Sequence, residues 1–363
     1  MTRLVIVSHP AVLPVNQMVY AEMLRRGWDV RLIVPAAWRH DYEPYHLLPE
    51  ALPELDSRIT ALPVLLAGRP QRHVYRTRPQ SVLRAMEPDV VFLEQEPFAL
   101  AAAQWGFAAA LLRVPFGVQI AENLDRHLPW PVRALRTRVL RSASYVAARS
   151  PRAADLATQW GATGAVTVIP HHVPAWPAER RARTAFTVGY AGRLSAEKGL
   201  ETLVCAVRRL EPPVDLLIAG DGVMRRELAQ ADLGDGRQVI VHSDLGHGQM
   251  ASAFSEMDVL VLPSRTTPTW SEQFGRVLVE AMSCGVPVIG SDSGEIPWVI
   301  RVTGGGLTFP EGDEARLAAA LTTLRNDTAR RRALAEQGRR RVAEIFSVEA
   351  VATTFERGLA TVV

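Results

Sequence analysis

Short runs of Val, Ile and Leu alternate with amphipathic segments along the whole chain. Apolar runs this continuous are expected for strands of a parallel sheet that helices cover on both faces. A chain of 363 residues also exceeds the size at which a single hydrophobic core usually stops growing. The pattern therefore predicts an α/β protein built from two parallel-sheet domains.

The first half contains the elements of one such domain. Strands are expected at 4–8, 29–34, 59–65, 89–93, 116–120, 144–148 and 166–169. Helices are expected at 15–27, 79–86, 97–112, 130–141 and 151–160. A stretch rich in Pro and Arg then runs from Pro170 to Arg183 without periodicity, so it is the predicted domain boundary.

The second half repeats this pattern. Strands are expected at 186–190, 214–219, 238–241, 258–262, 286–290 and 306–308. Helices are expected at 198–210, 223–231, 247–255, 275–283, 294–300, 313–325, 328–343 and 348–359. The domains are thus predicted at 1–175 and 186–345, with a linker at 176–185 and a final segment at 346–363. Two such halves predict a ligand cleft between them.

Composition excludes several classes of protein. No stretch approaches the roughly 20 apolar residues that span a bilayer, and the apolar run after Arg3 is too short for a signal peptide. The two cysteines, Cys205 and Cys284, form neither a disulfide framework nor a zinc spacing, which favours a reducing cytoplasm. No motif that reads nucleic acid is present.

The net charge of +3 is unevenly spread, since residues 1–180 hold 20 Arg against 15 acidic residues. The basic residues bunch in two places: Arg69, Arg72, Arg76, Arg78 and Arg84, then Arg133, Arg136, Arg138 and Arg141. Such a bunch is typical of a solvated helix face, or of a patch for lipid headgroups or a phosphate-bearing acceptor. Together with Trp105 and Trp130, these basic residues leave open a peripheral contact with an anionic membrane.

A glycine-containing turn opens the second half, from Gly189 to Gly199. Glycine at a strand end lets the backbone approach a ligand, and the helix expected from Lys198 would favour an anion. Arg193 and Lys198 place two cations on this turn, suited to clamping a diphosphate. Lys198 is the only lysine among 40 arginines, and a lysine presents a compact point charge. Alternatively, it caps the helix.

A second polar loop, from Pro263 to Phe274, leads into a helix expected near Gly275. Glu272 lies just ahead of this helix and Glu280 inside it. If all the residues between them were helical, the two would be about 12 Å apart along the axis. One carboxylate could then hold sugar hydroxyls and the other a ribose diol, with a diphosphate on the amides of Gly275, Arg276 and Val277. The alternative is that Glu272 only caps the helix.

These motifs carry a family resemblance. Glu272-x7-Glu280, within Glu-Gln-Phe-Gly-x-Val-x-x-Glu-Ala-Met and followed by Cys-Gly-Val-Pro-Val-Ile-Gly-Ser, resembles the retaining glycosyltransferases of family 4. Gly192-Arg193-Leu194 with Lys198-Gly199, and Ile218-Ala219-Gly220-Asp221-Gly222, are similar to the same family. The resemblance implies the GT-B fold: two Rossmann-like parallel-sheet domains facing across a cleft, with the last helix crossing back to the first domain.

The resemblance also implies roles for individual residues. Arg193 and Lys198 would bind the diphosphate of a nucleotide-sugar donor, Glu280 the ribose hydroxyls, and Glu272 the transferred sugar. Other expected donor contacts are Gly192, Phe274, Gly275, Arg276 and Val277, with Asp244 and Leu245 facing the base. The acceptor would be a hydroxyl compound bound by the first domain.

The first domain departs from the commonest family pattern. Its first strand-to-helix loop, Ser8 to Asn16, contains Pro14 and no glycine, which makes close approach to a phosphate less assured. Glu122 and Asn123 follow the strand at 116–120 and are candidates for the sugar side of the cleft, unless they cap their own loop. Glu96 follows the strand at 89–93 and could meet an acceptor.

No metal or other cofactor is expected. The chain has no Asp-x-Asp sequence, and its histidines lack ligand spacing. The resemblance implies transfer with retention, in which the leaving diphosphate helps to deprotonate the acceptor. No second carboxylate is identifiable for a covalent double displacement. A sugar-nucleotide epimerase, a phosphorylase, an enzyme joining cyclitols and a non-catalytic sugar-nucleotide sensor stay open as alternatives.

Overall fold

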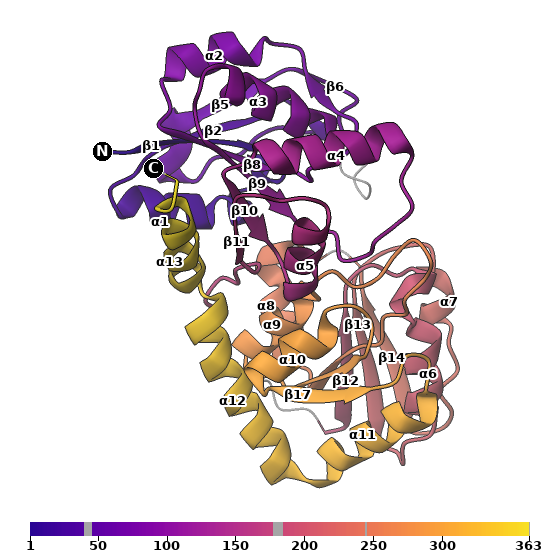
Figure 1. The fold of residues 1–363 in the computed structure, drawn as a ribbon. Coiled ribbons are helices and arrows are strands. Elements are labelled where there is room, and N and C mark those ends of the chain that lie inside the picture. Colours follow the sequence, from indigo (N-terminus) through magenta and orange to yellow (C-terminus); the bar gives the residue numbers. More distant parts are fainter. Residues whose placement is uncertain (40–45, 177–183, 244, 363) are drawn as a thin grey trace. The chain divides into compact units, whose positions relative to one another are not determined.

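The computed structural model describes residues 1–39, 46–176, 184–243 and 245–362 (Figure 1). The chain divides into two compact units. Unit 1 comprises Met1–His172 together with Val348–Val363, and unit 2 comprises Val173–Ser347. Most of the linker expected at 176–185 lies outside the described residues.

Unit 1 is built on a seven-stranded parallel sheet with the order β11-β10-β9-β8-β1-β2-β5. Its strands are β1 (Arg3–Ser8), β2 (Asp29–Pro35), β5 (Ile59–Leu62), β8 (Val90–Glu94), β9 (Phe116–Ile120), β10 (Tyr145–Ala148) and β11 (Ala165–Val168). The order reverses once, between β1 and β8. Leu4 and Ile6 of β1 belong to one hydrophobic core, and Val5 and Val7 to another. Both faces of the sheet are therefore covered, which explains the uninterrupted apolar runs.

The helices of unit 1 flank this sheet. They are α1 (Met18–Arg25), α2 (Pro79–Met86), α3 (Leu100–Leu111), α4 (Trp130–Ser142), α5 (Pro151–Gln159) and α13 (Val348–Leu359). Short 3-10 helices cover Pro10–Val12, Pro14–Asn16 and Pro53–Arg58. Two small antiparallel ribbons pair β3 (Trp38–Arg39) with β4 (His46–Leu47), and β6 (Val64–Leu65) with β7 (Val74–Tyr75).

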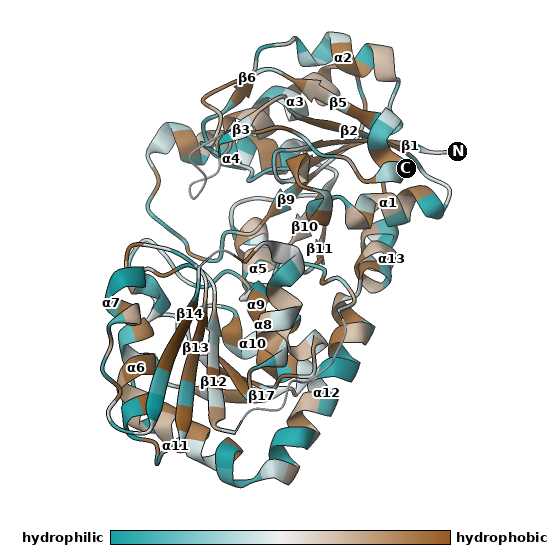
Figure 2. Cartoon of the chain, turned by 180° about the vertical axis from the view of Figure 1, so that it is seen from behind, coloured by the Kyte–Doolittle hydropathy of each residue, from teal (hydrophilic) through white to brown (hydrophobic). Residues whose placement is uncertain are grey.

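Unit 2 repeats the plan with a six-stranded parallel sheet in the order β14-β13-β12-β15-β16-β17. Its strands are β12 (Phe186–Ala191), β13 (Val214–Ala219), β14 (Arg237–His242), β15 (Val259–Leu262), β16 (Val288–Ser291) and β17 (Gly306–Phe309). Its helices are α6 (Leu200–Arg208), α7 (Arg225–Ala229), α8 (Met250–Ser255), α9 (Arg276–Ser283), α10 (Ile296–Thr303), α11 (Glu314–Asn326) and α12 (Thr328–Phe346), with 3-10 turns η4 (Ala196–Lys198) and η5 (His247–Gln249). In Figure 2 the strands β2 and β13 are mostly brown, as expected of covered sheets.

Helix α13 belongs to unit 1 although it follows all of unit 2 in the chain. Arg26, just after α1, donates to the Thr353 hydroxyl at 2.8 Å, and the Trp28 indole donates to Glu356 at 2.9 Å. Figure 1 shows α13, in yellow, alongside α1. Gly358 of α13 faces the buried ring of Tyr145 on β10, so close that an added Cβ would overlap it.

Several expected elements differ in their bounds, and three of these differences have a clear local cause. The strand expected at 59–65 stops at Leu62, because Pro63 has no N–H for the ladder, and Val64–Leu65 pairs elsewhere. The helix expected at 198–210 begins at Leu200, after Gly199 adopts a left-handed φ of 67°. The helix expected at 15–27 begins at Met18, because Pro14–Asn16 forms a separate 3-10 turn. Across the described residues, no helix is long and apolar enough to cross a membrane.

Gly358→Ala should destabilise the protein by about 1–3 kcal/mol, because the new methyl group overpacks against Tyr145. A Gly-to-Ala change within an unconstrained helix stabilises by about 0.5–1 kcal/mol. The sign of the change in the free energy of unfolding therefore shows whether position 358 is tightly packed. Urea unfolding followed by tryptophan fluorescence measures the difference. Arg357→Ala, at an exposed neighbouring position, is the control; equal or higher stability of Gly358→Ala would contradict the packing described.

Candidate functional site

The two motifs of unit 2 follow neighbouring strands. β12 and β15 lie side by side at the point where the strand order of the sheet reverses. In parallel sheets the loops at the carboxyl ends of two such strands diverge to opposite faces and leave a ligand-binding crevice. The Arg193–Lys198 turn follows β12, and the Glu272 loop follows β15.

The turn after β12 is held by its neighbours. The buried Tyr190 hydroxyl donates to the carbonyl of Arg193 at 2.6 Å. The amide of Leu194 donates to the carbonyl of Asp221 at 2.9 Å. Gly220 and Gly222, with φ of 150° and 153°, pack against the backbones of Gly192 and Leu194, where any Cβ would overlap. The Gly220-Asp221-Gly222 sequence therefore supports the turn.

Lys198 and Glu272 form an ion pair. Lys198 Nζ lies 2.7 Å from Glu272 Oε2, and the two side chains are only 13% and 12% exposed. The Ser264 hydroxyl donates to the same carboxylate oxygen at 2.8 Å. Lys198 Nζ also lies 4.7 Å from the ring centroid of Trp270. Most of the charge on this single lysine is thus shielded from water and compensated by one carboxylate.

Close backbone packing brings the two loops together. Gly199 lies against the carbonyl of Pro263, leaving no room for a side chain. The amide of Arg265 donates to the carbonyl of Glu197 at 2.8 Å. The position of Lys198 opposite Glu272 is therefore fixed by the backbone as well as by the ion pair.

Arg193 lies at the other end of the same turn. Its Nη1 is 3.6 Å from Glu197 Oε1, and its side chain is 44% exposed. Glu197 also accepts a hydrogen bond from the Ser195 hydroxyl at 2.7 Å, which helps to lower the pKa of this carboxyl. Both expected cations thus lie on one turn, Lys198 half-buried and Arg193 reaching into solvent.

Glu280 lies on α9, whose N-cap is Gly275 in the left-handed region at φ 74°. Arg276 Nε is 3.0 Å from Glu280 Oε1, an ion pair without hydrogen-bond geometry, and Glu280 is 7% exposed. Residues 272–275 are not helical, so the 12 Å separation does not apply. The first amides of α9, including those of Arg276 and Val277, have no acceptor within the helix and suit an anion.

The remaining expected donor contacts differ in position. The Phe274 ring is buried in the core and packs on Trp298 and Phe346, with centroids 6.1 and 5.7 Å away. Only its backbone is placed to meet a ligand. Leu245 packs against the core, as does Val277. Asp244 lies outside the described residues.

In unit 1 the expected residues follow β1, β8 and β9, which are adjacent in the sheet. Pro14 lies in the 3-10 turn Pro14–Asn16 after β1. Glu96 follows β8, and its Oε1 accepts from the amide of Ala121 at 2.8 Å. Glu122 and Asn123 follow β9 and are both buried, and Glu122 forms an ion pair with Arg126. These residues follow the carboxyl ends of the two strands at the reversal, β1 and β8, and of the neighbouring strand β9.

Glu96 is unusual among them. Burial raises the pKa of its carboxyl to about 8, despite the backbone hydrogen bond from Ala121, and the nearby Glu122 carboxylate adds to the rise. Its Oε2 has no hydrogen-bond partner in the part of the chain that the structure describes. Burial thus favours the protonated form of Glu96 at neutral pH, and its buried Oε2 lacks a hydrogen-bond partner among the described residues.

Sequence reasoning missed other polar residues at these edges. Ser264 and Trp270, which contact the Lys198–Glu272 pair, were not singled out. In unit 1 Glu94, which belongs to the same predicted acceptor segment as Glu96, accepts from Ser8, Tyr20 and Arg149 at 2.6, 2.7 and 2.8 Å. The sequence signal that could have identified Ser264 and Glu94 is a polar residue at or just after the end of an apolar strand. Of the described residues, no three His, Cys, Asp or Glu side chains form a metal-binding group.

Two family models cover most of the chain and do not overlap. "Glycosyl transferase 4-like domain" matches residues 13–172, and "Glycosyl transferases group 1" matches residues 176–341. The chain is 30% identical over 334 residues to the GDP-mannose-dependent alpha-mannosyltransferase of Mycolicibacterium smegmatis, covering 83% of this chain and 81% of that protein. It is also 30% identical over 295 residues to the glycogen synthase of Mycobacterium tuberculosis, covering 74% and 68%.

Solved structures agree on the fold. Anabaena HepE in complex with UDP matches with a TM-score of 0.74 at 18% identity, over 99% of this chain and 100% of that one. Sucrose-phosphate synthase from Thermosynechococcus elongatus matches with a TM-score of 0.73 at 21% identity, over 99% of both chains. With two Rossmann-like units and these relatives, the chain belongs to the GT-B glycosyltransferases of the group 1, family 4 type.

Proposed function

We propose that this glycosyltransferase moves a sugar from a nucleoside-diphosphate donor to a hydroxyl acceptor with retention of anomeric configuration. The observation that carries the proposal is the Lys198–Glu272 pair, formed by loops of β12 and β15 where the strand order reverses. This crevice is where sheets of this topology bind nucleotides. The only lysine of the chain occupies it.

Each site residue has a proposed role. Arg193, Lys198 and the N-terminus of α9 bind the diphosphate, with Gly192 allowing close approach of the backbone. Glu280 binds the ribose hydroxyls, and Glu272 contacts the transferred sugar. Lys198 Nζ lies beside Glu272, so a bound donor would give the ammonium group a phosphate partner and keep the glutamate nearby for sugar hydroxyls.

The chemistry follows from these roles. The bond from the anomeric carbon to the diphosphate oxygen breaks through an oxocarbenium-like state. The acceptor oxygen attacks the same face, and the leaving diphosphate takes its proton. Arg193, Lys198 and the α9 amides stabilise the charge that develops on the diphosphate. We propose that these groups suffice without a metal ion.

The names of the relatives support a nucleotide-sugar donor. One relative is described as GDP-mannose-dependent, and the structural neighbour HepE is a complex with UDP. We propose hexosyl transfer in the synthesis of a cell-surface polysaccharide, glycolipid or secondary metabolite, in the cytoplasm or at the inner face of the membrane. For membrane contact, Trp130 is 73% exposed, whereas Trp105 is fully buried and is excluded from the surface.

A panel of UDP-, GDP- and ADP-sugars in a chelating buffer should contain a donor that raises the unfolding temperature. The rise should grow with donor concentration, since binding at a hundred times Kd stabilises by about 2.7 kcal/mol. Transfer to an acceptor, or slow donor hydrolysis, would separate an enzyme from a sensor. Conversion of the donor without acceptor would indicate an epimerase, and a donor effect that requires a divalent metal would contradict the metal-free proposal.

Lys198→Ala and Glu272→Ala should each lower turnover at least about a hundredfold, because losing one preorganised group at a developing charge costs around 3 kcal/mol. Steady-state kinetics with the identified donor measures the loss. Arg301→Ala and Glu336→Ala, at exposed positions on α10 and α12, are the charge-matched controls. Wild-type turnover in either site variant would remove the assignment.

We further propose that Glu96, Glu122, Asn123 and the Pro14 turn form the acceptor side.

Glu96→Gln should flatten the pH dependence of the free energy of unfolding. Between the ordinary pKa of 4.5 and about 8, folded Glu96 keeps a proton that the unfolded chain releases. Wild-type stability should therefore fall as pH rises through this window, by up to about 1.4 kcal/mol per pH unit, and the neutral amide removes this loss.

Urea unfolding at pH 5, 6.5 and 8 measures this effect, with Glu54→Gln at an exposed position as the control. Equal pH profiles for wild type and Glu96→Gln would show that Glu96 is ionised at neutral pH, contrary to its burial.

A further inference from the structure

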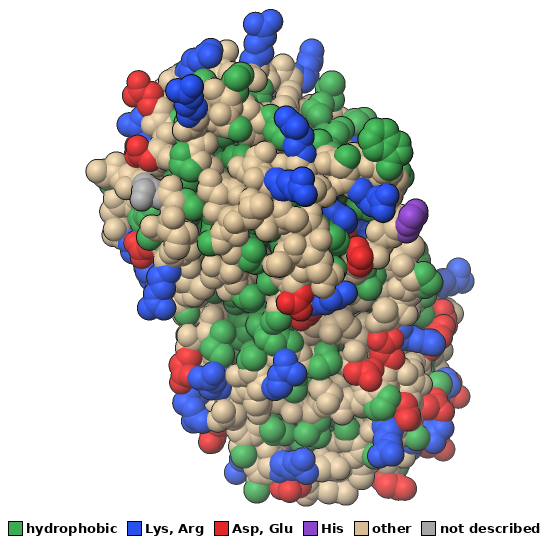
Figure 3. Space-filling view, in the orientation of Figure 1, with side chains coloured by type: hydrophobic (Ala, Val, Ile, Leu, Met, Phe, Trp, Pro, Cys, Tyr) green, Lys and Arg blue, Asp and Glu red, His purple; other side chains and the backbone are tan. Residues whose placement is uncertain are grey.

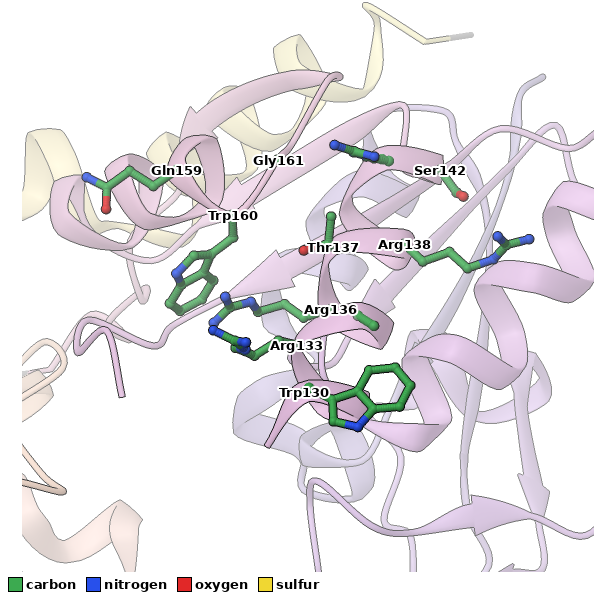
Figure 4. A pocket seen from close by; sticks show the side chains of 11 residues that line it. Trp130, Arg133, Arg136, Thr137, Arg138, Ser142, Gln159, Trp160 and Gly161 are labelled. Atoms are coloured by element: carbon green, nitrogen blue, oxygen red, sulfur yellow. The ribbon is translucent and has the colours of Figure 1, made fainter. Parts of the chain in front are cut away.

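An open groove lies in unit 1 between α4 and the end of α5, built from residues with no role in the proposed reaction. Its volume is about 960 Å³. Figure 4 shows its lining, with Trp130, Arg133, Arg136 and Thr137 on α4, and Trp160 just after α5. Figure 3 shows Lys and Arg side chains, in blue, on the visible face of unit 1.

Arg136 is the key residue of this groove. It is 6% exposed, and its guanidinium carbon lies 3.7 Å from the ring centroid of Trp160. Its Nε and Nη1 are buried and have no hydrogen-bond partner among the described residues. A buried guanidinium normally satisfies its N–H groups with acceptors, so this cation lacks the partners that its burial requires.

A second cation lies beside it. Figure 4 shows the guanidinium of Arg133 next to that of Arg136, and both point toward Trp160. Burial lowers the pKa of Arg136; Asp125 and Glu122 oppose this effect, while the positive charge of Arg133 adds to it. Two adjacent guanidinium groups repel each other, and an anion between them would reverse that repulsion.

The nearby carboxylates are engaged elsewhere. Asp125 accepts from the Trp160 indole at 2.8 Å, and Glu122 pairs with Arg126. No carboxylate of the described chain lies within ion-pair distance of Arg133 or Arg136. Arg141 and the hydroxyl-bearing Thr137 and Ser142 also line the groove. The lining is thus rich in donors and carries positive charge in excess.

We propose that this groove binds a phosphate group, carried by a soluble phosphate ester or by a lipid headgroup. Arg136 and Arg133 would donate to the phosphate oxygens while Trp160 holds the Arg136 guanidinium flat from the other side. A phosphate suits the groove better than a single carboxylate, since it offers more acceptor oxygens and more charge to several cations. The donor residues lie in unit 2, so the inference does not rest on the proposed transfer.

The test measures binding of inorganic phosphate and glycerol phosphate by calorimetry, and of phosphatidylcholine vesicles with and without phosphatidylglycerol by co-sedimentation. Full-length Lys198→Ala is measured in parallel to separate this groove from the donor site. Phosphate binding at the groove should persist in Lys198→Ala, whereas binding at the donor site should be lost there. Failure of the donor proposal would therefore leave this measurement unaffected.

Arg136→Gln should weaken binding about tenfold or more, the loss expected for charge-assisted hydrogen bonds. Arg133→Gln, at an exposed position, should weaken it several-fold without affecting folding. Arg152→Gln, an equal charge change on α5 outside the groove, is the control and should bind as wild type. The unfolding temperature of each variant checks its fold.

Soluble phosphate binding that depends on Arg136 and Arg133 supports the site and assigns a soluble ligand. Binding that depends on these arginines but occurs only on phosphatidylglycerol vesicles supports it and assigns a headgroup. If both site variants bind both probes as tightly as Arg152→Gln, or if wild type binds neither probe, the proposal is overturned.

Discussion

Both units depend on a parallel sheet that is buried on its two faces. The side chains of β1 alternate between two separate cores, and this burial leaves the loops at the strand ends as the places where polar groups can gather. In each sheet the strand order reverses once, between β1 and β8 and between β12 and β15. The candidate site residues collect at or next to these reversals, because there the connecting loops part.

The loops at the unit 2 reversal are held by backbone packing more than by their own side chains. Gly199 lies against Pro263, and Gly220 against Gly192, at distances that exclude a Cβ. Such packing fixes Lys198 opposite Glu272. A charge held in advance needs no reorganisation when a leaving group develops negative charge, which is the main advantage of a protein site over water.

Much of this could be predicted from the sequence. The parallel strands follow from their apolar runs, and Lys198 and Glu272 stand out as polar residues in loops beside them. The breaks at Pro63 and Gly199 were missed because the apolar periodicity continues past both residues. Pro63 has no N–H for the strand ladder, and Gly199 adopts a left-handed conformation ahead of α6. Ser264 and Trp270 were missed because their contacts with the ion pair depend on how the loop after β15 folds back on itself and toward Lys198. The burial of Arg136 could not be inferred either, since it depends on Trp160, a residue of another element.

The path of the chain has a consequence for synthesis. Unit 1 needs α13, which follows unit 2 in the chain, while unit 2 is contained between residues 173 and 347. Domains generally fold as they emerge from the ribosome, the N-terminal one first. Here the sheet of unit 1 must wait, with the surface of α1 and Tyr145 uncovered, until the segment that follows unit 2 has been translated. Unit 2 is therefore able to complete its fold before unit 1, although most of unit 1 is synthesised earlier.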